Sequence, residues 1–312
     1  MSSKYLKFKL ILVLTKSMQN KKFPTWIKVK APTTKEFNKV KELAKNTCLE
    51  TVCQSANCPN IAECWSKKHA TFMIMGNICT RSCRFCNITT GKPKILDKDE
   101  PRKVALAIKQ LGLKHCVITS VTRDDLPDGG AQHFANTINE IKEKCNGTTI
   151  EVLTPDFIGK NGALEIVIKA KPDIFNYNIE TVRRLHKKIK IGSDYDNALF
   201  LHKKAKEIDS KIFTKSGLIV GMGETDYEIY ETMDDLIKNN VDFLTIGQYL
   251  KPQDKNPRYI DIDRFVPLEQ FKEYETIGYQ KGFLLVKAGP LIRSSYHADE
   301  NFNILKDKLN IQ

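Results

Sequence analysis

Short apolar runs alternate with amphipathic stretches through the middle of the chain. Most of the runs lack polar alternation and are rich in β-branched or aromatic residues, which is typical of strands buried on both faces. They predict strands at Phe72–Met75, Cys116–Val121, Thr149–Leu153, Ile174–Asn178, Ser216–Val220 and Phe243–Ile246. Helical patterns lie between them, at about 101–111, 131–144, 161–170, 195–209 and 225–239. This alternation predicts an α/β fold with a parallel sheet and right-handed crossovers.

The same pattern divides the chain into four parts. We expect a poorly structured segment at 1–23, a cysteine-rich N-terminal extension at 24–70, the strand–helix region at 71–250 and a C-terminal extension at 251–312. Periodicity alone does not distinguish an open sheet from a partial or full (β/α) barrel. A length of 312 residues suits one barrel with extensions. The globular pattern begins near residue 24, so a start at Met18 stays open.

Composition narrows the class of protein. Apolar residues make up 41% of the chain, which is enough for a real core and excludes a disordered protein. No apolar run reaches the roughly 18–20 residues that a membrane span needs, and the run at 10–14 is short for a signal peptide. We therefore expect no membrane insertion and a cytoplasmic location, while a mitochondrial one stays open.

Polar and charged residues follow several of the predicted strands. They occur in the loop 121–130, at Asn178–Glu180, at Lys215 and at 221–224. In open α/β sheets and in barrels, the loops at the carboxyl ends of the strands build the binding site. These residues are therefore predicted to gather at one end of the sheet.

Seven of the nine cysteines lie between positions 48 and 86, and six of them form two triplets. Cys79, Cys83 and Cys86 are spaced C-x3-C-x2-C directly after the first strand, and Cys53, Cys58 and Cys64 are spaced C-x4-C-x5-C. Clustered cysteines in a chain without export signals indicate metal or redox chemistry. A structural zinc site is closed by four protein ligands, and zinc ribbons supply them as C-x2-C pairs. Only Cys83 and Cys86 form such a pair in this chain. A triplet on an iron–sulfur cluster leaves one iron open to another ligand.

The first triplet resembles the motif of the radical S-adenosylmethionine (SAM) superfamily, including the aromatic Phe85 before its last cysteine. The resemblance implies a partial (β/α) barrel of the TIM type. It also implies that Cys79, Cys83 and Cys86 hold a 4Fe–4S cluster whose open iron binds SAM. One electron from that cluster would then cleave SAM to a 5′-deoxyadenosyl radical and methionine.

Further blocks resemble the lipoyl synthases of that superfamily. They are VCQSANCPNIAECW around the second triplet, the segment 26–32, VTRDDLPDGGA at 121–131, GLIVGMGE at 217–224, LTIGQYL at 244–250 and GPLIRSSYHAD at 289–299. The resemblance implies a second 4Fe–4S cluster on Cys53, Cys58, Cys64 and a serine of the RSSY motif, Ser295 rather than Ser294. It also implies insertion of two sulfur atoms, taken from this cluster, at carbons 6 and 8 of a protein-bound octanoyl-lysine.

The resemblance implies partners as well. They are octanoylated lipoyl carriers (acyltransferase subunits of 2-oxoacid dehydrogenases and the glycine cleavage H protein), a low-potential donor of the ferredoxin or flavodoxin type, and iron–sulfur assembly proteins. The net charge of +13 suits an acidic carrier, with the basic run 183–190 as one candidate face, although a merely solvated basic surface explains the charge too. Nucleic acid is not expected, because no aromatic residues are interleaved with that run.

Candidate SAM or substrate contacts each have a structural alternative. Asp124 and Asp125 lie in a loop that otherwise reads as a turn and helix start, Glu180 has Arg183 as a surface partner, and Lys215 reads equally as a surface residue. Arg293 is expected to orient the site beside Ser295. His297 is the only histidine near the serine ligand.

The chain departs from the family pattern at four places. Cys48 is not part of the family motif and could compete as a fourth cluster ligand, and Tyr177 stands where histidine is usual. The loop 188–194 lacks the usual Arg-Pro-Gly sequence, and the segment 251–262 differs from the usual continuation.

Two other functions stay open. One is a sulfur-inserting enzyme similar to biotin synthase, acting on a free small molecule. The other is a protein without this chemistry, either an iron–sulfur carrier or a basic zinc module that binds nucleic acid. The second cysteine triplet and the RSSY motif argue against the first. The barrel-like middle of the chain argues against the second.

Overall fold

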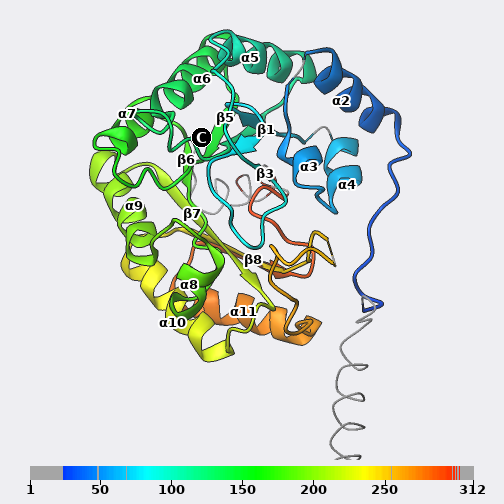
Figure 1. The fold of residues 1–312 in the computed structure, drawn as a ribbon, viewed down its shortest axis with the longest axis vertical. Coiled ribbons are helices and arrows are strands. Elements are labelled where there is room, and N and C mark those ends of the chain that lie inside the picture. Colours follow the sequence, from blue (N-terminus) through cyan, green and yellow to red (C-terminus); the bar gives the residue numbers. More distant parts are fainter. Residues whose placement is uncertain are drawn as a thin grey trace, which may run out of the picture.

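The core is a sheet of parallel strands that curves into a partial barrel (Figure 1). The computed structural model describes residues 24–47, 49–67, 69–253, 255–296, 298, 300 and 302. In sheet order the strands are β1 (Thr71–Ile74), β4 (His115–Ser120), β5 (Thr149–Leu153), β6 (Ile174–Asn176), β7 (Phe213–Val220), β8 (Phe243–Gln248) and β9 (Leu285–Gly289). Every neighbouring pair is parallel. The predicted partial barrel is therefore confirmed.

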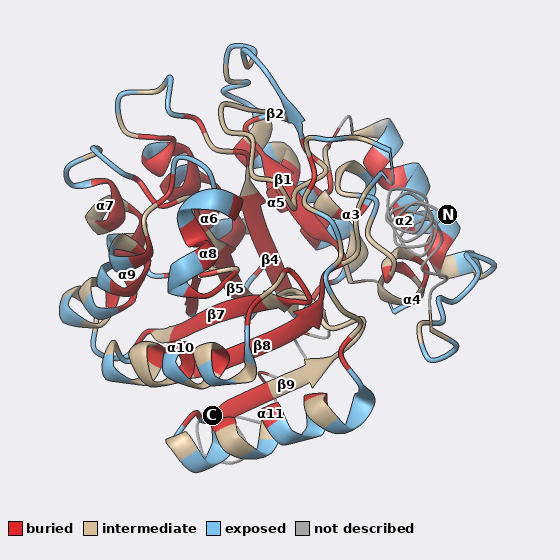
Figure 2. Ribbon diagram, turned by 60° about the horizontal axis from the view of Figure 1, so that its bottom comes forward, coloured by how far each residue is buried: buried red, intermediate tan, exposed pale blue. Residues whose placement is uncertain are grey.

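Helices cover the outer face of the sheet, so its strands are buried on both sides (Figure 2). They are α5 (Glu100–Leu111), α6 (Ala131–Lys144), α7 (Ala163–Lys169), α8 (Arg183–Ile189), α9 (Tyr195–Ile208), α10 (Asp226–Lys238) and α11 (Leu268–Lys281). Local signals begin and end them. Thr225 and Glu228 form a capping box on α10, and Gly112 ends α5 in the left-handed conformation that glycine adopts without strain.

The strands β1 and β9 are the two ends of the strand order, and other segments flank the opening between them. The N-terminal helices α2 (Lys35–Asn46), α3 (Val52–Ser55) and α4 (Ile61–Ser66) stand beside β1 (Figure 1). A bridge between Thr51 and Phe72 joins them to that strand. The amide of Asn60 donates to the Leu291 carbonyl at 2.6 Å, which ties these helices to the loop after β9.

A second, two-stranded sheet extends the end of β1. It pairs β2 (Ile78–Cys79) with β3 (Thr89–Thr90) in parallel. Met75 and Gly76, both with positive φ, make the turn from β1 into this pair. The first cysteine triplet therefore leaves the barrel on a short strand of its own rather than on the end of β1.

The predicted strands and helices agree with the structure to within a few residues, with three differences. The fifth strand begins at Phe213, so Lys215 lies inside β7 and not before it. The basic run forms the unpredicted helix α8. The sheet continues past the boundary expected at 250, because β9 pairs with β8. Residues 1–23, Cys48 and His297 lie outside the described residues, and none of the described helices is long and apolar enough to cross a membrane.

Candidate active site

The first triplet lies over the carboxyl end of the sheet. Cys79 ends β2, and Cys83 and Cys86 follow in a loop that hydrogen bonds fasten to distant segments. Arg84 donates its backbone N–H to Ile189, and its carbonyl accepts from Ile260. All three cysteines line one cavity of about 500 Å³. The loop is held in place by the barrel and the C-terminal extension together.

The chemistry of these thiols fits a metal cluster. Burial raises the pKa of Cys83 to about 11 and that of Cys86 to about 12, and the three sulfurs sense one another. All eight cysteines that the structure describes are free thiols. Thiolates are the form that binds metal, and a bound cation favours them over thiols. Three half-buried thiols without a disulfide therefore match the donor set of an iron–sulfur cluster.

Charged groups of both signs line the wall of the larger cavity. Lys190 donates to the Tyr177 hydroxyl and to the Asn178 carbonyl, both at 2.6 Å. Burial disfavours its ammonium, but Tyr177 and Glu180 outweigh this and raise the pKa of Lys190. Burial raises the pKa of Glu180, which sits at positive φ. An ammonium and a carboxyl group facing one cavity suit a ligand that carries both charges.

The structure decides between the two alternatives for Glu180. Arg183 pairs with Asp196 at 2.8 Å and leaves Glu180 to face the cavity. Lys190, expected only in the basic run and in the loop that departs from the family pattern, lines the same cavity beside Tyr177. Their pairing was hidden from sequence reasoning because thirteen residues separate them.

Asp124 and Asp125 are both held by arginines. Arg81, between two cysteines of the first triplet, binds Asp124 at 2.8 Å and Asp156 at 2.5 Å. Asp125 binds Arg123 at 2.8 Å. These partners lower the pKa of both carboxyl groups. Neither aspartate lines the larger cavity, although Arg81 and Asp156 do, so Asp124 is placed to hold the triplet's loop.

Lys215 lies inside the barrel wall, away from the larger cavity. Its ammonium contacts both carboxylate oxygens of Glu151 at 3.0 Å, and Glu151 also accepts from Asn176 at 2.7 Å. Burial alone would raise the pKa of Glu151, but Lys215 and His115 lower it to about 2. The Glu151 carboxylate is therefore stabilised in its charged form, and the Lys215 side chain is occupied by it.

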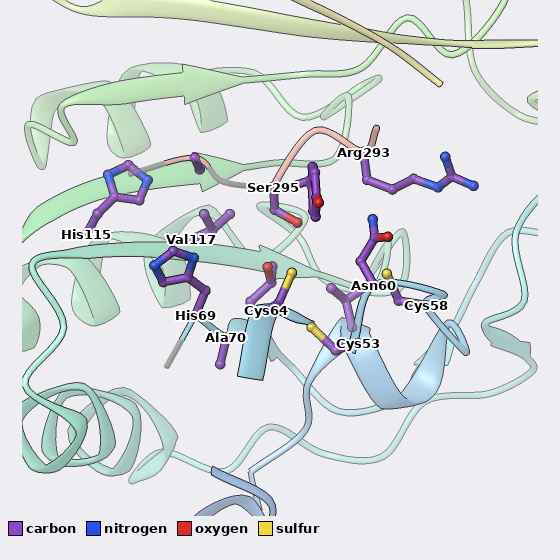
Figure 3. Close-up of a pocket in the computed structure, with 14 residues that line it drawn as sticks. Cys53, Cys58, Asn60, Cys64, His69, Ala70, His115, Val117, Arg293 and Ser295 are labelled. Carbon is purple, nitrogen blue, oxygen red and sulfur yellow. The ribbon is translucent and has the colours of Figure 1, made fainter. Parts of the chain in front are cut away.

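The second triplet surrounds a smaller cavity of about 40 Å³ (Figure 3). Cys53 lies in α3, Cys58 in the turn after it and Cys64 in α4. Burial raises the pKa of all three thiols, and that of Cys53 reaches about 11. Within the described residues, no three His, Cys, Asp or Glu side chains converge tightly enough to hold a single metal ion. The cysteines surround a space rather than a point.

The C-terminal loop after β9 closes this smaller cavity. Arg293, Ser295 and Tyr296 line it, and Figure 3 shows Ser295 across the cavity from Cys53 and Cys64. Burial lowers the pKa of Arg293, which nearby Cys58 opposes. Ser294 is turned away, since its hydroxyl accepts from the Asn178 amide at 2.9 Å. Ser295, and not Ser294, therefore lines the cavity that the second triplet surrounds.

Two positions hold this loop through contacts that the sequence does not reveal. A side chain at Gly247 in β8 would meet the Ile292 carbonyl oxygen and, at 2.7 Å, the Arg293 guanidinium. Asn178, at the end of β6, holds Ser294 across 116 residues of sequence. A glycine inside a buried strand is a sign of close backbone approach, but it does not say which segment approaches.

The two cavities share part of their walls. Cys58, Arg293 and Ser295 line both of them. The two cysteine triplets therefore face connected space, one at each end.

Comparison with known proteins agrees with this arrangement. A family model described as the radical SAM superfamily matches residues 73–236, and one described as the N-terminal domain of lipoyl synthase of the radical SAM family matches residues 2–58. The fold is similar to Streptococcus suis SuiB bound to S-adenosylmethionine, with 16% identity over 73% of this chain and 53% of that chain and a TM-score of 0.53.

A second similar structure is HydG, a maturase of the FeFe-hydrogenase, with 16% identity over 73% of this chain and 57% of that chain and a TM-score of 0.51. The chain thus spans a little over half the length of these two proteins. At such identity, both likenesses concern the fold alone.

Proposed function

This chain belongs to the radical SAM superfamily, and we propose that it is a lipoyl synthase. Membership supports a 4Fe–4S cluster and SAM as cofactors, and Cys79, Cys83 and Cys86 are the residues proposed to hold that cluster. The proposed reaction inserts two sulfur atoms at carbons 6 and 8 of an octanoyl chain on a lysine of a carrier protein. By this proposal the enzyme is a sulfurtransferase.

One observation carries the proposal beyond the superfamily. Ser295 closes a small cavity with Cys53, Cys58 and Cys64, and this cavity adjoins the one that the first triplet lines. Three thiols and a hydroxyl fit a second 4Fe–4S cluster, proposed here as the sulfur donor. A hydroxyl is a weaker ligand for iron than a thiolate, which suits a cluster that must come apart. A cluster so placed faces the space where the acyl chain would be activated.

The SAM cofactor and its cluster would supply a carbon radical able to take hydrogen from unactivated C–H bonds. The chain's own residues bind and orient the reactants and exclude side reactions. Lys190 and Glu180 offer opposite charges to SAM at one wall of the larger cavity. Met73, Leu218 and Ile219 line the same cavity and suit an apolar acyl chain.

The proposed partners follow from this reaction. They are an octanoylated carrier domain, a low-potential reductant and an iron–sulfur assembly system that restores the second cluster. The proposed compartment is the cytoplasm, because such sites require reduced thiols. The basic charge of the chain suits the acidic carriers, since complementary charge speeds docking.

Single-turnover mass spectrometry tests the proposal. Anaerobically reconstituted protein is incubated with SAM, a strong reductant and an octanoyl-lysine peptide. We expect a product that has gained two sulfurs, together with 5′-deoxyadenosine. The Cys58→Ala variant should still cleave SAM but should not form the product that has gained two sulfurs.

The Cys145→Ala variant is the matched control. Cys145 is a buried thiol that donates a hydrogen bond to the Ala105 carbonyl, and it lines neither cavity. It should behave like the unmodified protein. SAM cleavage without any sulfur in the product would leave the superfamily intact and contradict lipoyl synthase activity. An enzyme acting on a free small molecule would then be the better conclusion.

A further inference from the structure

The loop 91–98, which follows β3, presents a basic and apolar surface. We name it the basic loop, and its exposed side chains are Lys92, Lys94, Ile95, Asp97 and Lys98. Ile95 is 98% exposed, the highest value for any large hydrophobic side chain in the described part of the chain. The loop leaves β3, which pairs with β2, and leads to α5. An isolated exposed apolar side chain is ordinary, but Ile95 is flanked by lysines and so forms part of a mixed basic and apolar surface.

The charges of the basic loop are not cancelled. Asp97, the one acidic residue of the loop, binds Lys103 at 2.7 Å, and Asp99, just after the loop, binds Arg102 at 2.9 Å. Lys92, Lys94 and Lys98 have no carboxylate partner among the described residues.

The run 183–190, the face expected from the sequence, differs in part. Its arginines pair with Asp196 and Glu228, and Lys190 lines the larger cavity. Lys187 and Lys188 of α8 are also exposed and have no carboxylate partner among the described residues, so α8 keeps two such charges where the basic loop keeps three. The basic loop differs from α8 by its exposed Ile95 and by its bond to the first triplet.

The stem of the basic loop is bonded directly to a cysteine of the first triplet. Thr90 pairs with Cys79 across the β2–β3 ladder, and the Gly91 N–H donates to the Cys79 carbonyl at 3.0 Å. The Thr90 hydroxyl donates to the Arg81 carbonyl at 3.0 Å. One hydrogen bond thus separates the exposed loop from the backbone of a proposed cluster ligand.

We propose that the basic loop is the docking surface for the protein that reduces the radical SAM cluster, a one-electron donor with an acidic surface around its redox centre. The donor loses one electron, the cluster held by Cys79 gains it, and no proton or group is transferred. The inference rests on superfamily membership and on that cluster's ligands within the proposed function. It does not depend on sulfur insertion.

The size and chemistry of the surface fit this class of partner. Electron-transfer encounters are weak and use small interfaces, below about 1,200 Å² in total. They are steered by complementary charge, which raises association rates at low salt. A carrier domain must instead thread its acyl arm into the larger cavity, and the residues of the basic loop do not line that cavity.

The test measures reduction of the cluster directly. Reduced flavodoxin is mixed anaerobically with the reconstituted enzyme in a stopped-flow spectrometer, and the bleaching of the cluster is followed at several salt concentrations. The Lys92→Glu/Lys94→Glu variant should be reduced at least about tenfold more slowly at low salt, with a weaker dependence on salt. Ile95→Ala should be a few-fold slower by the same measurement. Reduction by dithionite should be unchanged in both variants.

The matched control reverses the same number of charges on α8, in Lys187→Glu/Lys188→Glu. Its reduction by flavodoxin should stay within twofold of the unmodified enzyme. Cluster absorbance and circular dichroism establish that each variant is folded and loaded before it is compared. Equal reduction rates in the basic-loop variant and in the control would overturn the inference.

A different outcome would assign the basic loop to the carrier. The variant would then be reduced normally by flavodoxin, but dithionite-driven sulfur insertion into a carrier domain would fall. This too would overturn the inference. Because the rates of cluster reduction and 5′-deoxyadenosine formation do not involve sulfur, a failure of lipoyl synthase activity would leave the test of the basic loop intact.

Discussion

The two cysteine triplets are built in opposite ways. Cys79, Cys83 and Cys86 lie within eight residues of one another on a single loop. Cys53, Cys58 and Cys64 come from two short helices, and Ser295, which completes their cavity, lies more than two hundred residues further along the chain.

The difference teaches which site depends on the whole fold. The first needs only its loop and the segments that hold it. The second exists only when the N-terminal helices and the C-terminal loop meet beside β1, as the Asn60 bond to Leu291 shows. We therefore expect damage to the fold to reach the second site before the first.

The largest effect should follow the loss of a thiol from the local site. In Cys86→Ala, 5′-deoxyadenosine formation should fall by roughly three orders of magnitude or more, because no acid–base group replaces radical chemistry. Iron analysis should still find the second cluster. If both clusters disappear together, the two sites are not independent and the comparison fails.

The ion pair inside the barrel wall should matter to stability rather than to the cofactor. Lys215→Met leaves the Glu151 carboxylate buried without its partner, which costs about 3–5 kcal/mol of unfolding free energy. Denaturant unfolding measures this, and the double variant Glu151→Gln/Lys215→Met should recover most of the loss. A raised KM for SAM with unchanged unfolding would instead support the cofactor role expected from the sequence.

The two serines should behave differently. Ser295→Ala should make the second cluster lose iron to a chelator roughly 10- to 100-fold faster, an effect of the size found when support for a metal ligand is removed. Ser294→Ala removes an acceptor from Asn178 and costs only about 1 kcal/mol of stability. The reverse ranking of iron loss would assign the ligand to Ser294.

Gly247 offers a way to disturb the assembled site alone. A methyl group there meets the Ile292 backbone, so Gly247→Ala should displace the C-terminal loop and cost about 1–3 kcal/mol. Iron counts after anaerobic gel filtration should show loss from the second cluster with the first retained. Gly289→Ala is the control, since its new methyl would meet only the tip of Ile292 at 3.3 Å.

Acid should weaken the barrel that both sites share. Burial lowers the pKa of His202 to about 3, and its ring nitrogen donates to the Tyr177 carbonyl. Below pH 6.5 the unfolded chain then binds a proton that the native chain does not, so stability falls as the pH falls from 6.5 towards 3. The slope from this group reaches at most about 1.4 kcal/mol per pH unit.

Urea unfolding at a series of pH values measures this slope. The His202→Asn variant should show a shallower dependence between pH 6.5 and 4. The His133→Asn variant is the comparison. The ring of His133 contacts the carboxylate of Glu100 at 2.6 Å, whereas that of His202 contacts a backbone carbonyl. An equal slope in His202→Asn and in the unmodified protein would contradict the assignment to His202.

Much of the barrel was predictable because its signals are local. Buried parallel strands are apolar throughout, and the helices between them carry an amphipathic pattern with caps at their ends. The six strands expected in the middle of the chain are present. The start of β7 was misplaced because Lys215 reads as a surface residue until Glu151 is seen beside it.

The candidate site was predictable in part for the same reason. Candidate ligands that lie within one span of eight residues can be recognised by their spacing alone. Three pairings could not be recognised from the sequence, because each joins separate loops. They are Tyr177 with Lys190, Arg81 with Asp124 and Asp156, and Asn178 with Ser294. Their contacts depend on how the strands are ordered and on where each loop leaves the sheet.

By itself, the sequence determined the strand–helix alternation, the two cysteine triplets as candidate ligands and the family resemblance, because thiol spacing and hydrophobic periodicity are properties of neighbouring residues. The tertiary structure alone decided that Ser295 lies beside the second triplet while Ser294 accepts from Asn178, that Lys215 is bound by Glu151 and that the two cavities adjoin. The physical reason is that side chains distant in the sequence interact only after the sheet has curved and its two edges have been brought close to the terminal segments.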